Sequence, residues 1–467
     1  MPSGKRSRQL FGQDRGHGRW GALGYLAALG LIWSCAVFRK GATDDRDWIV
    51  CLLAIGALTL FYWLRTSENE LAPALPGWIW LPLGLSIGVM VLQLVPLPAA
   101  LIEIVSPVRA ELQDSLAVAG SPGWPSVSVA PSKTTFHLLR FLGCVATLLL
   151  VRNLTWRLRR KSWIVAIPLV FVASLEGLLA VIQTAAGPSR LGVSGTYVNH
   201  NHLAGMLELS LPLSLALVAV LLSRMRSDVP ASGLLTAKAA AALIGVALIF
   251  AGLVCSYSRT GFVAALISVV VMASLAFIRR GTGRAKIAVA LAAILLLATV
   301  FFFLLPDGFL VRYAGVASTD GLLSEGRVSL WSETLDLVRA YPVLGCGFGA
   351  YQSAFYKFKR LWPHVTDDYA HNDYVQLLAE LGPLGLAAGL WLVGGIVARA
   401  IAAGRASLDP PVLLALACVG SLVAIGIHSV TDFNLYIPAN SMQFAWVLGM
   451  ASALPLFSTA RNRASPS

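Results

Sequence analysis

The sequence predicts an all-α polytopic membrane protein with about twelve transmembrane helices and one long loop that carries short helices. Composition is the first reason, because 57% of the 467 residues are hydrophobic and only 13% are charged. A soluble domain carries about a quarter charged residues. The mean hydropathy of +0.73 agrees with this. The second reason is the recurrence of apolar runs close to the roughly 20 residues that cross a bilayer as a helix.

These apolar runs divide the chain into twelve predicted spans within a single membrane domain, 1–467. The first run follows a basic segment but lacks a small-residue cleavage site, so we interpret it as a span and not as a removable signal. The second and twelfth runs are the shortest. The predicted spans are 20–38, 48–64, 78–97, 134–151, 163–183, 202–222, 235–256, 260–278, 287–305, 375–398, 411–428 and 441–457.

Clusters of basic residues occur in alternate loops, and this pattern predicts the topology. Arginine and lysine cluster in the loops at 152–161, 224–238 and 279–286 and accompany the two terminal tails, 1–19 and 458–467. Short basic loops mark the cytoplasmic side of a membrane, so both tails are predicted to be cytoplasmic. The net charge of +13 is then mainly a topology signal. It therefore gives no reason to expect a nucleic-acid partner.

The outward segment 306–374, between the ninth and tenth predicted spans, is too long for a simple connector. Loops of this length are usually functional or separately structured. Within it, Val328, Trp331, Leu335 and Val338 recur at helical spacing. The pattern predicts an amphipathic helix lying at the membrane interface.

Two arginines in the outward loops are candidates for binding an anion. Arg259 lies in SYSRTG, at the tip of a tight helical hairpin, where Ser258 adds a hydroxyl group. Arginine is always charged, and its planar fork binds phosphate through two hydrogen bonds. Arg327, in EGRVSLW, is a weaker candidate because a solvated arginine is the usual case in a loop. The alternative for Arg259 is an interfacial arginine whose guanidinium extends to water.

The segment AHNDYVQLLAELG brings His371, Asn372 and Asp373 to the start of the tenth predicted span. A helix N-terminus favours an anion, and a neutral histidine there can act as a general base near neutral pH. The alternative is a histidine that only caps the helix. His428 and Asp432, at the outer end of the eleventh span, are candidates for supporting roles.

Another outward loop holds Asn199, His200, Asn201 and His202 in GTYVNHNHLAG. Two histidines two residues apart, with no cysteine or carboxylate cluster nearby, are weak evidence for a metal site. We therefore predict neither a metal nor a cofactor. The amide and imidazole groups would suit sugar hydroxyls or the shape of the loop. The six cysteines, mostly within apolar runs, are interpreted as small apolar residues without a disulfide framework.

Several of these segments resemble blocks of one family. His371 and Asn372, followed after nine residues by GPLG, resemble the signature of the O-antigen ligase family. GTYVNHNHLAG, SYSRTG and GRVSLW…YPVLGCGFGAY resemble further blocks of that family in the same order. The resemblance implies a metal-independent, inverting glycosyltransferase of the bacterial inner membrane whose active site faces the periplasm. Its donor would be a glycan on undecaprenyl pyrophosphate, and its acceptor a hydroxyl on the lipid A core or another glycan.

The resemblance also implies roles for individual residues. Arg259 and Arg327 would hold the donor pyrophosphate, and His371 would deprotonate or orient the acceptor hydroxyl. The pyrophosphate leaving group needs charge stabilisation, which arginines supply without a metal. Supporting residues would be Asn199, Asn201, Ser258, Asn372, Asp373, His428 and Asp432.

Other functions remain open alternatives at this point. The same family includes O-antigen and exopolysaccharide polymerases and protein O-oligosaccharyltransferases, which share the motif and differ in acceptor. A polyanion transporter or flippase is an alternative of another class, because about twelve spans and several arginines would suit one. Transporter sites usually lie near the bilayer midplane, however, and here the polar residues sit at outer helix ends. A third alternative is a non-catalytic membrane scaffold for envelope assembly.

Overall fold

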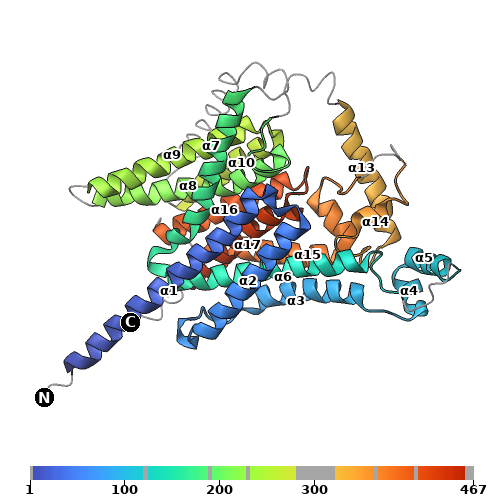
Figure 1. Ribbon diagram of the computed structural model, residues 1–467, viewed down its shortest axis with the longest axis horizontal. Helices are drawn as coiled ribbons and strands as arrows, with labels where there is room; N and C mark the ends of the chain where they lie inside the picture. Colours follow the sequence, from blue (N-terminus) through green and yellow to red (C-terminus); the bar gives the residue numbers. More distant parts are fainter. Residues whose placement is uncertain are drawn as a thin grey trace.

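The computed structural model describes residues 4–118, 125–187, 192–227, 232–279, 321–360, 367–403 and 409–457. Over these ranges the chain is nearly all helical, with one isolated β-bridge between Pro96 and Ser126 and no strand. Long helices form a bundle, and short helices gather at one of its ends (Figure 1). The helices are α1 (Gly4–Phe38), α2 (Asp45–Arg65), α3 (Gly77–Leu94), α4 (Ala99–Val105), α5 (Pro107–Val118), α6 (Pro131–Arg157), η3 (Arg159–Ala166), α7 (Ile167–Ala186), α8 (His200–Ser227), α9 (Gly233–Cys255), α10 (Arg259–Arg279), α13 (Gly321–Ala340), α14 (Tyr351–Phe355), α15 (Asp373–Ala403), α16 (Pro410–His428), η5 (Asn434–Tyr436) and α17 (Pro438–Ala453).

The prediction of a polytopic all-α membrane protein is confirmed. Within the described ranges, ten helices are long and apolar enough to cross a membrane, and each overlaps one predicted span. The twelfth predicted span, 441–457, corresponds to α17, which has 16 residues and falls short of the length of the other ten. The ninth predicted span, 287–305, lies outside the described residues, as do 306–320 and 361–366 of the long outward segment.

Helices α8 and α16 form the centre of the bundle. In the most apolar stretch of each helix, 78% of the α8 residues and 61% of the α16 residues are buried, against 22% for α2 and for α15. Apolar faces on the outer helices suit a lipid environment, where small residues and polar bonds bring helices together. Between α8 and α16, the Ser421 hydroxyl donates to the Leu209 carbonyl at 2.6 Å. A Cβ atom on Gly420 would lie 3.1 Å from the Pro212 side chain, so the two helices approach closely.

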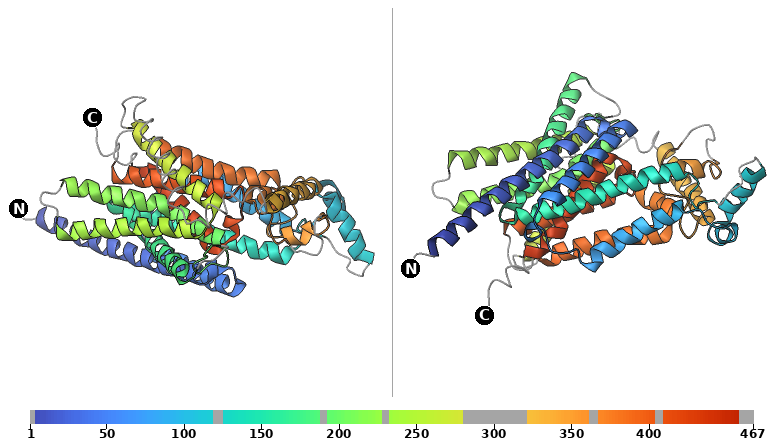
Figure 2. Two further views of the ribbon diagram at one scale, coloured as in Figure 1. Left: turned by 90° about the horizontal axis from the view of Figure 1, so that it is seen from above. Right: turned by 60° about the horizontal axis from the view of Figure 1, so that its bottom comes forward.

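The predicted outward loops meet at one end of this bundle. The Val193 amide donates to the Cys255 carbonyl at 3.2 Å, and the Asp373 amide donates to the Ser429 carbonyl at 2.9 Å. At the other end, the rings of Trp156 and Phe457 lie 6.1 Å apart, beside the basic loop that follows α6. Helix α1 also begins at that opposite end, away from α4, α5, α13 and α14 (Figure 2).

The predicted amphipathic helix is present as α13. Its packed face carries Leu337 and leads to Tyr341, and these side chains join Tyr351 and Phe355 in a second hydrophobic core. The predicted apolar face is more open, since Val328 is 60% exposed and Leu335 is 41% exposed. Val338, on the same predicted face, packs against the second core, so that face is packed in part and exposed in part.

A kink in α15 lets the glycine-rich segment after α13 pack into the bundle. Gly382 adopts φ +67°, and a Cβ atom there would lie 2.3 Å from the Val343 carbonyl oxygen. Only glycine fits both the left-handed conformation and the contact. The carboxylate of Glu380 then accepts from the amides of Gly349 and Tyr351, at 2.9 Å and 3.2 Å. This buried carboxylate, which sequence alone marks as a charge inside a span, thus anchors a loop.

Candidate active site

The N-terminus of α15 positions His371. The side-chain oxygen of Asn372 accepts from the amides of Tyr374 and Val375, at 3.0 Å and 3.1 Å. Asn372 therefore caps the helix, as asparagine often does. His371 precedes the cap with φ +50°, a conformation that non-glycine residues seldom adopt. Its side chain is 35% exposed, so the imidazole is partly open at the loop end of the bundle.

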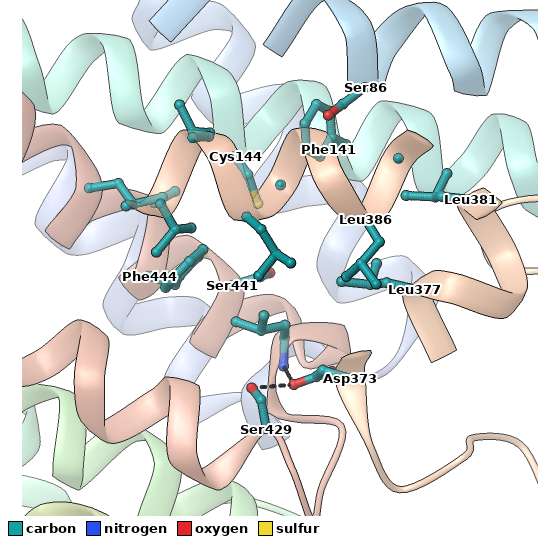
Figure 3. A pocket seen from close by; sticks show the side chains of 18 of the residues that line it. Ser86, Phe141, Cys144, Asp373, Leu377, Leu381, Leu386, Ser429, Ser441 and Phe444 are labelled. Atoms are coloured by element: carbon teal, nitrogen blue, oxygen red, sulfur yellow. Dashed lines mark hydrogen bonds between the residues drawn. The ribbon is translucent and has the colours of Figure 1, made fainter. Parts of the chain in front are cut away.

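Asp373 fastens α15 to the connection between α16 and α17. One oxygen of its carboxylate accepts from the Ser429 hydroxyl at 2.7 Å and from the Leu435 amide at 3.3 Å (Figure 3). The side chain is 1% exposed. Asp373 thus holds the 429–437 connection against the start of α15, next to His371.

Asp432 lies between two histidines from different parts of the chain. Its Oδ1 atom is 3.8 Å from Nδ1 of His371 and 3.7 Å from Nε2 of His202. These distances are longer than hydrogen bonds but short enough for strong charge interaction. Burial by itself would raise the pKa of Asp432, but the two imidazoles hold that pKa well below its usual range. Asp432 is therefore ionised at neutral pH.

An aromatic cluster fixes the positions of both imidazoles. The Phe433 ring stacks on Tyr369 with a centroid distance of 4.1 Å and an interplanar angle of 10°. The rings of His371 and His202 meet Phe433 edge-on at 4.9 Å and 4.8 Å. Such aromatic pairs contribute about 0.5–1.5 kcal/mol each beyond their buried area. His371 is thus held by packing on one side and by the charge of Asp432 on another.

Arg259 is joined to the same region through its neighbour. It is the first residue of α10, and the Thr431 hydroxyl donates to the Thr260 hydroxyl at 2.9 Å. This bond ties the tip of the α9–α10 hairpin to the connection that carries Asp432. The Ser258 hydroxyl accepts from the Gly261 amide at 3.3 Å and so caps α10. The arginine is partly buried, at the N-terminal end of a helix whose amides favour anions.

Arg327 lies on the helix that packs behind His371. Trp331, one turn further along α13 and on the same face, donates its indole N–H to the Ala370 carbonyl at 2.9 Å. Ala370 immediately precedes His371. The structure thus brings Arg327, Arg259 and His371 to one end of the bundle from three separate parts of the sequence.

The supporting asparagines of the 195–205 segment shape the start of α8. The Asn199 side chain accepts from the Asn201 amide at 2.8 Å, and the Asn199 carbonyl accepts from the His202 amide at 3.1 Å. This cap directs the buried His202 side chain toward Asp432. The side chain of His202 joins the His371 cluster through Asp432, 3.7 Å away.

His428 pairs with a carboxylate inside the bundle. Its Nδ1 atom lies 3.1 Å from both carboxylate oxygens of Glu208, inside the bundle. Both side chains are at most 1% exposed. The pair links α8 to α16 directly beneath the Asp432 connection. His428 therefore supports the region from within and is not open to a ligand.

Sequence inspection missed Tyr369, Phe433 and Glu208, and it left the role of His202 open. Two of these had a signal, since Tyr369 and Phe433 are aromatic neighbours of His371 and Asp432. In the part of the chain that the structure describes, no three His, Cys, Asp or Glu side chains are placed to hold a metal ion.

Comparison with known proteins identifies one matching segment. Residues 244–390 match the family model described as O-antigen ligase. The matched segment includes Arg259, Arg327 and His371, and it runs from α9 into α15. No curated protein matches the chain at a significant level.

Proposed function

The chain belongs to the O-antigen ligase family through residues 244–390, and on that premise we propose that it transfers a glycan from undecaprenyl pyrophosphate to an acceptor hydroxyl. The proposed setting is the bacterial inner membrane, with both termini cytoplasmic and the His371 end of the bundle facing the periplasm. The acceptor would be the lipid A core or another surface glycan, so the protein would act in lipopolysaccharide or surface polysaccharide biosynthesis.

The observation that carries this proposal is the environment of His371. Its ring is partly exposed, and the nitrogen nearer to the protein, Nδ1, lies 3.8 Å from the buried carboxylate of Asp432. The other ring nitrogen is then the one available to an acceptor hydroxyl. A carboxylate behind a histidine orients the imidazole and stabilises the imidazolium formed when it takes a proton.

The proposed reaction is a single displacement without a metal. The acceptor oxygen would attack the anomeric carbon as His371 removes its proton, the bond to the pyrophosphate oxygen would break, and the configuration would invert. Negative charge develops on the leaving pyrophosphate. Arg259 and Arg327 would stabilise that charge, because guanidinium groups bind phosphate oxygens through paired hydrogen bonds.

Asp432 is proposed as the positioning residue for His371. We expect Asp432→Asn to lower kcat by roughly 10- to 100-fold with KM little changed, because the variant removes the negative charge that stabilises the imidazolium formed in the reaction. Asp432→Glu should recover part of the loss. The measurement is the rate of glycan transfer by purified protein. Asp368→Asn is the matched control, since Asp368 is exposed and bonds only to Gln352 among described partners. Equal rates for Asp432→Asn and the native protein would contradict the role.

A deletion strain tests the function as a whole. We expect long polymer to accumulate on the lipid carrier while the acceptor stays bare, as loss of a ligase requires. The measurement separates carrier-bound from acceptor-bound glycan. Acceptor carrying single repeat units would instead indicate a polymerase, and loss of glycan from protein would indicate an O-oligosaccharyltransferase. An unchanged profile for all three fractions would contradict a transferase.

Transport is the less favoured function because of where the polar groups lie. His371, Asp432 and Arg259 gather at one end of the bundle, whereas transporter sites lie near the bilayer midplane on broken helices. Uptake of a polyanion by vesicles that contain the protein and no acceptor would support transport.

A further inference from the structure

His202 is a buried histidine to which the proposed reaction gives no role. It lies in the first turn of α8, and its side chain is 4% exposed. Its backbone is held from two sides, because its amide donates to the Asn199 carbonyl at 3.1 Å and Asn440 of α17 donates to its carbonyl at 2.9 Å. The fold therefore sets the position of this imidazole.

Helix α8 approaches the connection that carries Asp432 most closely near Gly205. Gly205 follows His202 by three residues and so lies on the same side of the helix. A Cβ atom on Gly205 would overlap the side-chain oxygen of Asn434, so the contact requires glycine. Asn440 donates to that same oxygen at 3.0 Å. These contacts bring the imidazole of His202 to the carboxylate of Asp432.

The two imidazoles face one oxygen atom of Asp432. Oδ1 lies 3.7 Å from Nε2 of His202 and 3.8 Å from Nδ1 of His371, and it accepts from the Phe433 amide at 2.8 Å. Within the described part of the chain, neither of these imidazole nitrogens has a hydrogen-bond partner, and neither has Oδ2 of Asp432. Buried polar atoms are normally partnered. The geometry therefore couples His202 to His371 through the carboxylate that both face.

The other ionisable groups around this unit have partners of their own or a fixed charge. His428 and Glu208 pair with each other at 3.1 Å, and Asp373 accepts a hydrogen bond from a hydroxyl at 2.7 Å. Burial raises the pKa of the Tyr369 phenol, which therefore stays neutral. The arginines at this end of the bundle keep their charge at any working pH, and they are Arg259 and Arg327.

We propose that His202 is a positioning residue that acts on His371 through Asp432. The Nε2–H of His202 is directed at the carboxylate, keeps it in place beside His371 and offsets part of its negative charge. Asp432 then attracts the imidazolium of His371 less strongly than it would alone. When His371 takes the proton of the acceptor hydroxyl, His202 keeps its own proton, because one carboxylate compensates one added charge. The inference rests on the proposed function, but part of its test needs no transfer.

Leucine and glutamine at position 202 separate the N–H donor from the packing. Both are neutral, and of the two only glutamine carries an N–H donor at the end of its side chain. His200→Leu is the matched control, because His200 lies two positions earlier on α8 and faces a different side of the helix. If His202→Leu does not fold, His202→Met gives the same comparison, since methionine also lacks the donor and adapts to irregular space.

The first measurement is the rate at which diethyl pyrocarbonate modifies His371 in the purified full-length protein over a range of pH. The reagent attacks the neutral imidazole, and peptide mass spectrometry distinguishes His371 from the other histidines. The pH of half-maximal rate should rise by about 0.5 in His202→Leu, because the undivided charge of Asp432 stabilises the imidazolium. His202→Gln and His200→Leu should match the native protein. In the Asp432→Asn background, His202→Leu should cause no shift.

The second measurement is the pH dependence of glycan transfer. The acid limb of kcat in His202→Leu should move to higher pH by the same amount, with KM unchanged. A modification midpoint in His202→Leu equal to that in His200→Leu would overturn the role of His202, as would a shift that persists in the Asp432→Asn background. The expected midpoint shift in a protein that transfers no glycan would instead overturn the proposed function and leave the coupling of His202 to His371 in place.

Discussion

Replacing His371 with alanine is expected to lower the rate of glycan transfer by about 100- to 10,000-fold, the usual contribution of a general base. No other described histidine could replace His371 as the base, because none is both partly exposed and next to the ionised Asp432. His202 is buried, and His428 is held by Glu208. The measurement is transfer by purified protein from a lipid-linked donor to its acceptor.

Two further variants make the His371 result interpretable. His371→Asn should lose activity to the same extent while fitting the backbone better, since asparagine tolerates the left-handed conformation at φ +50°. His17→Ala, in the predicted cytoplasmic tail, is the control histidine and should transfer normally. A folded His371→Asn variant with native rates would refute the assignment of His371 as the base.

Replacing Arg259 with alanine is expected to lower transfer by about 100- to 1,000-fold, as loss of one group that stabilises developing charge does elsewhere. Arg259 begins α10, so we expect its guanidinium and the helix amides to act on the same anion. Arg259→Lys should recover little, because lysine is a point charge and cannot bind phosphate through two parallel hydrogen bonds. Arg327→Ala should show a smaller loss. Rates at saturating and limiting donor concentrations distinguish charge stabilisation from donor binding.

Arg339 provides the control for these variants. It lies on α13, at the same end of the bundle as Arg327, but its side chain is 73% exposed and pairs with Asp336 at 2.6 Å. Arg339→Ala should therefore transfer at the native rate. If Arg259→Ala were as active as Arg339→Ala, Arg259 would be an interfacial arginine, and the pyrophosphate would need another partner.

The membrane spans were predictable because their determinants are local. A run of about 20 apolar residues is stable in lipid only as a helix that satisfies its own backbone hydrogen bonds. This reasoning located α8 and α16 to within a few residues of their bounds, His200–Ser227 and Pro410–His428. It also predicted the helix α13, but not that Leu337 would be buried while Val328 and Leu335 stay exposed. Contact with Tyr351 and Phe355 selects the buried side.

The candidate site was predictable in part for a similar reason. His371, Arg259 and Arg327 each stand out as polar residues beside apolar runs, so the sequence marks them one by one. The partnership of Asp432 with His371 and His202 spans three loops that are far apart in the chain. No local pattern in the sequence encodes that contact. His428 is closer to Asp432 in sequence, but its side chain lies inside the bundle against Glu208.

By itself, the sequence determined that this chain is a helical membrane protein and which polar residues lie at the ends of its helices. The physical reason is that each segment in the bilayer must satisfy its own backbone hydrogen bonds, and a long apolar segment does so as a helix. Only the tertiary structure decided that Asp432 lies between His371 and His202 and that His428 pairs with Glu208. These side-chain pairs arise from close packing between helices, which depends on contacts between residues far apart in the sequence.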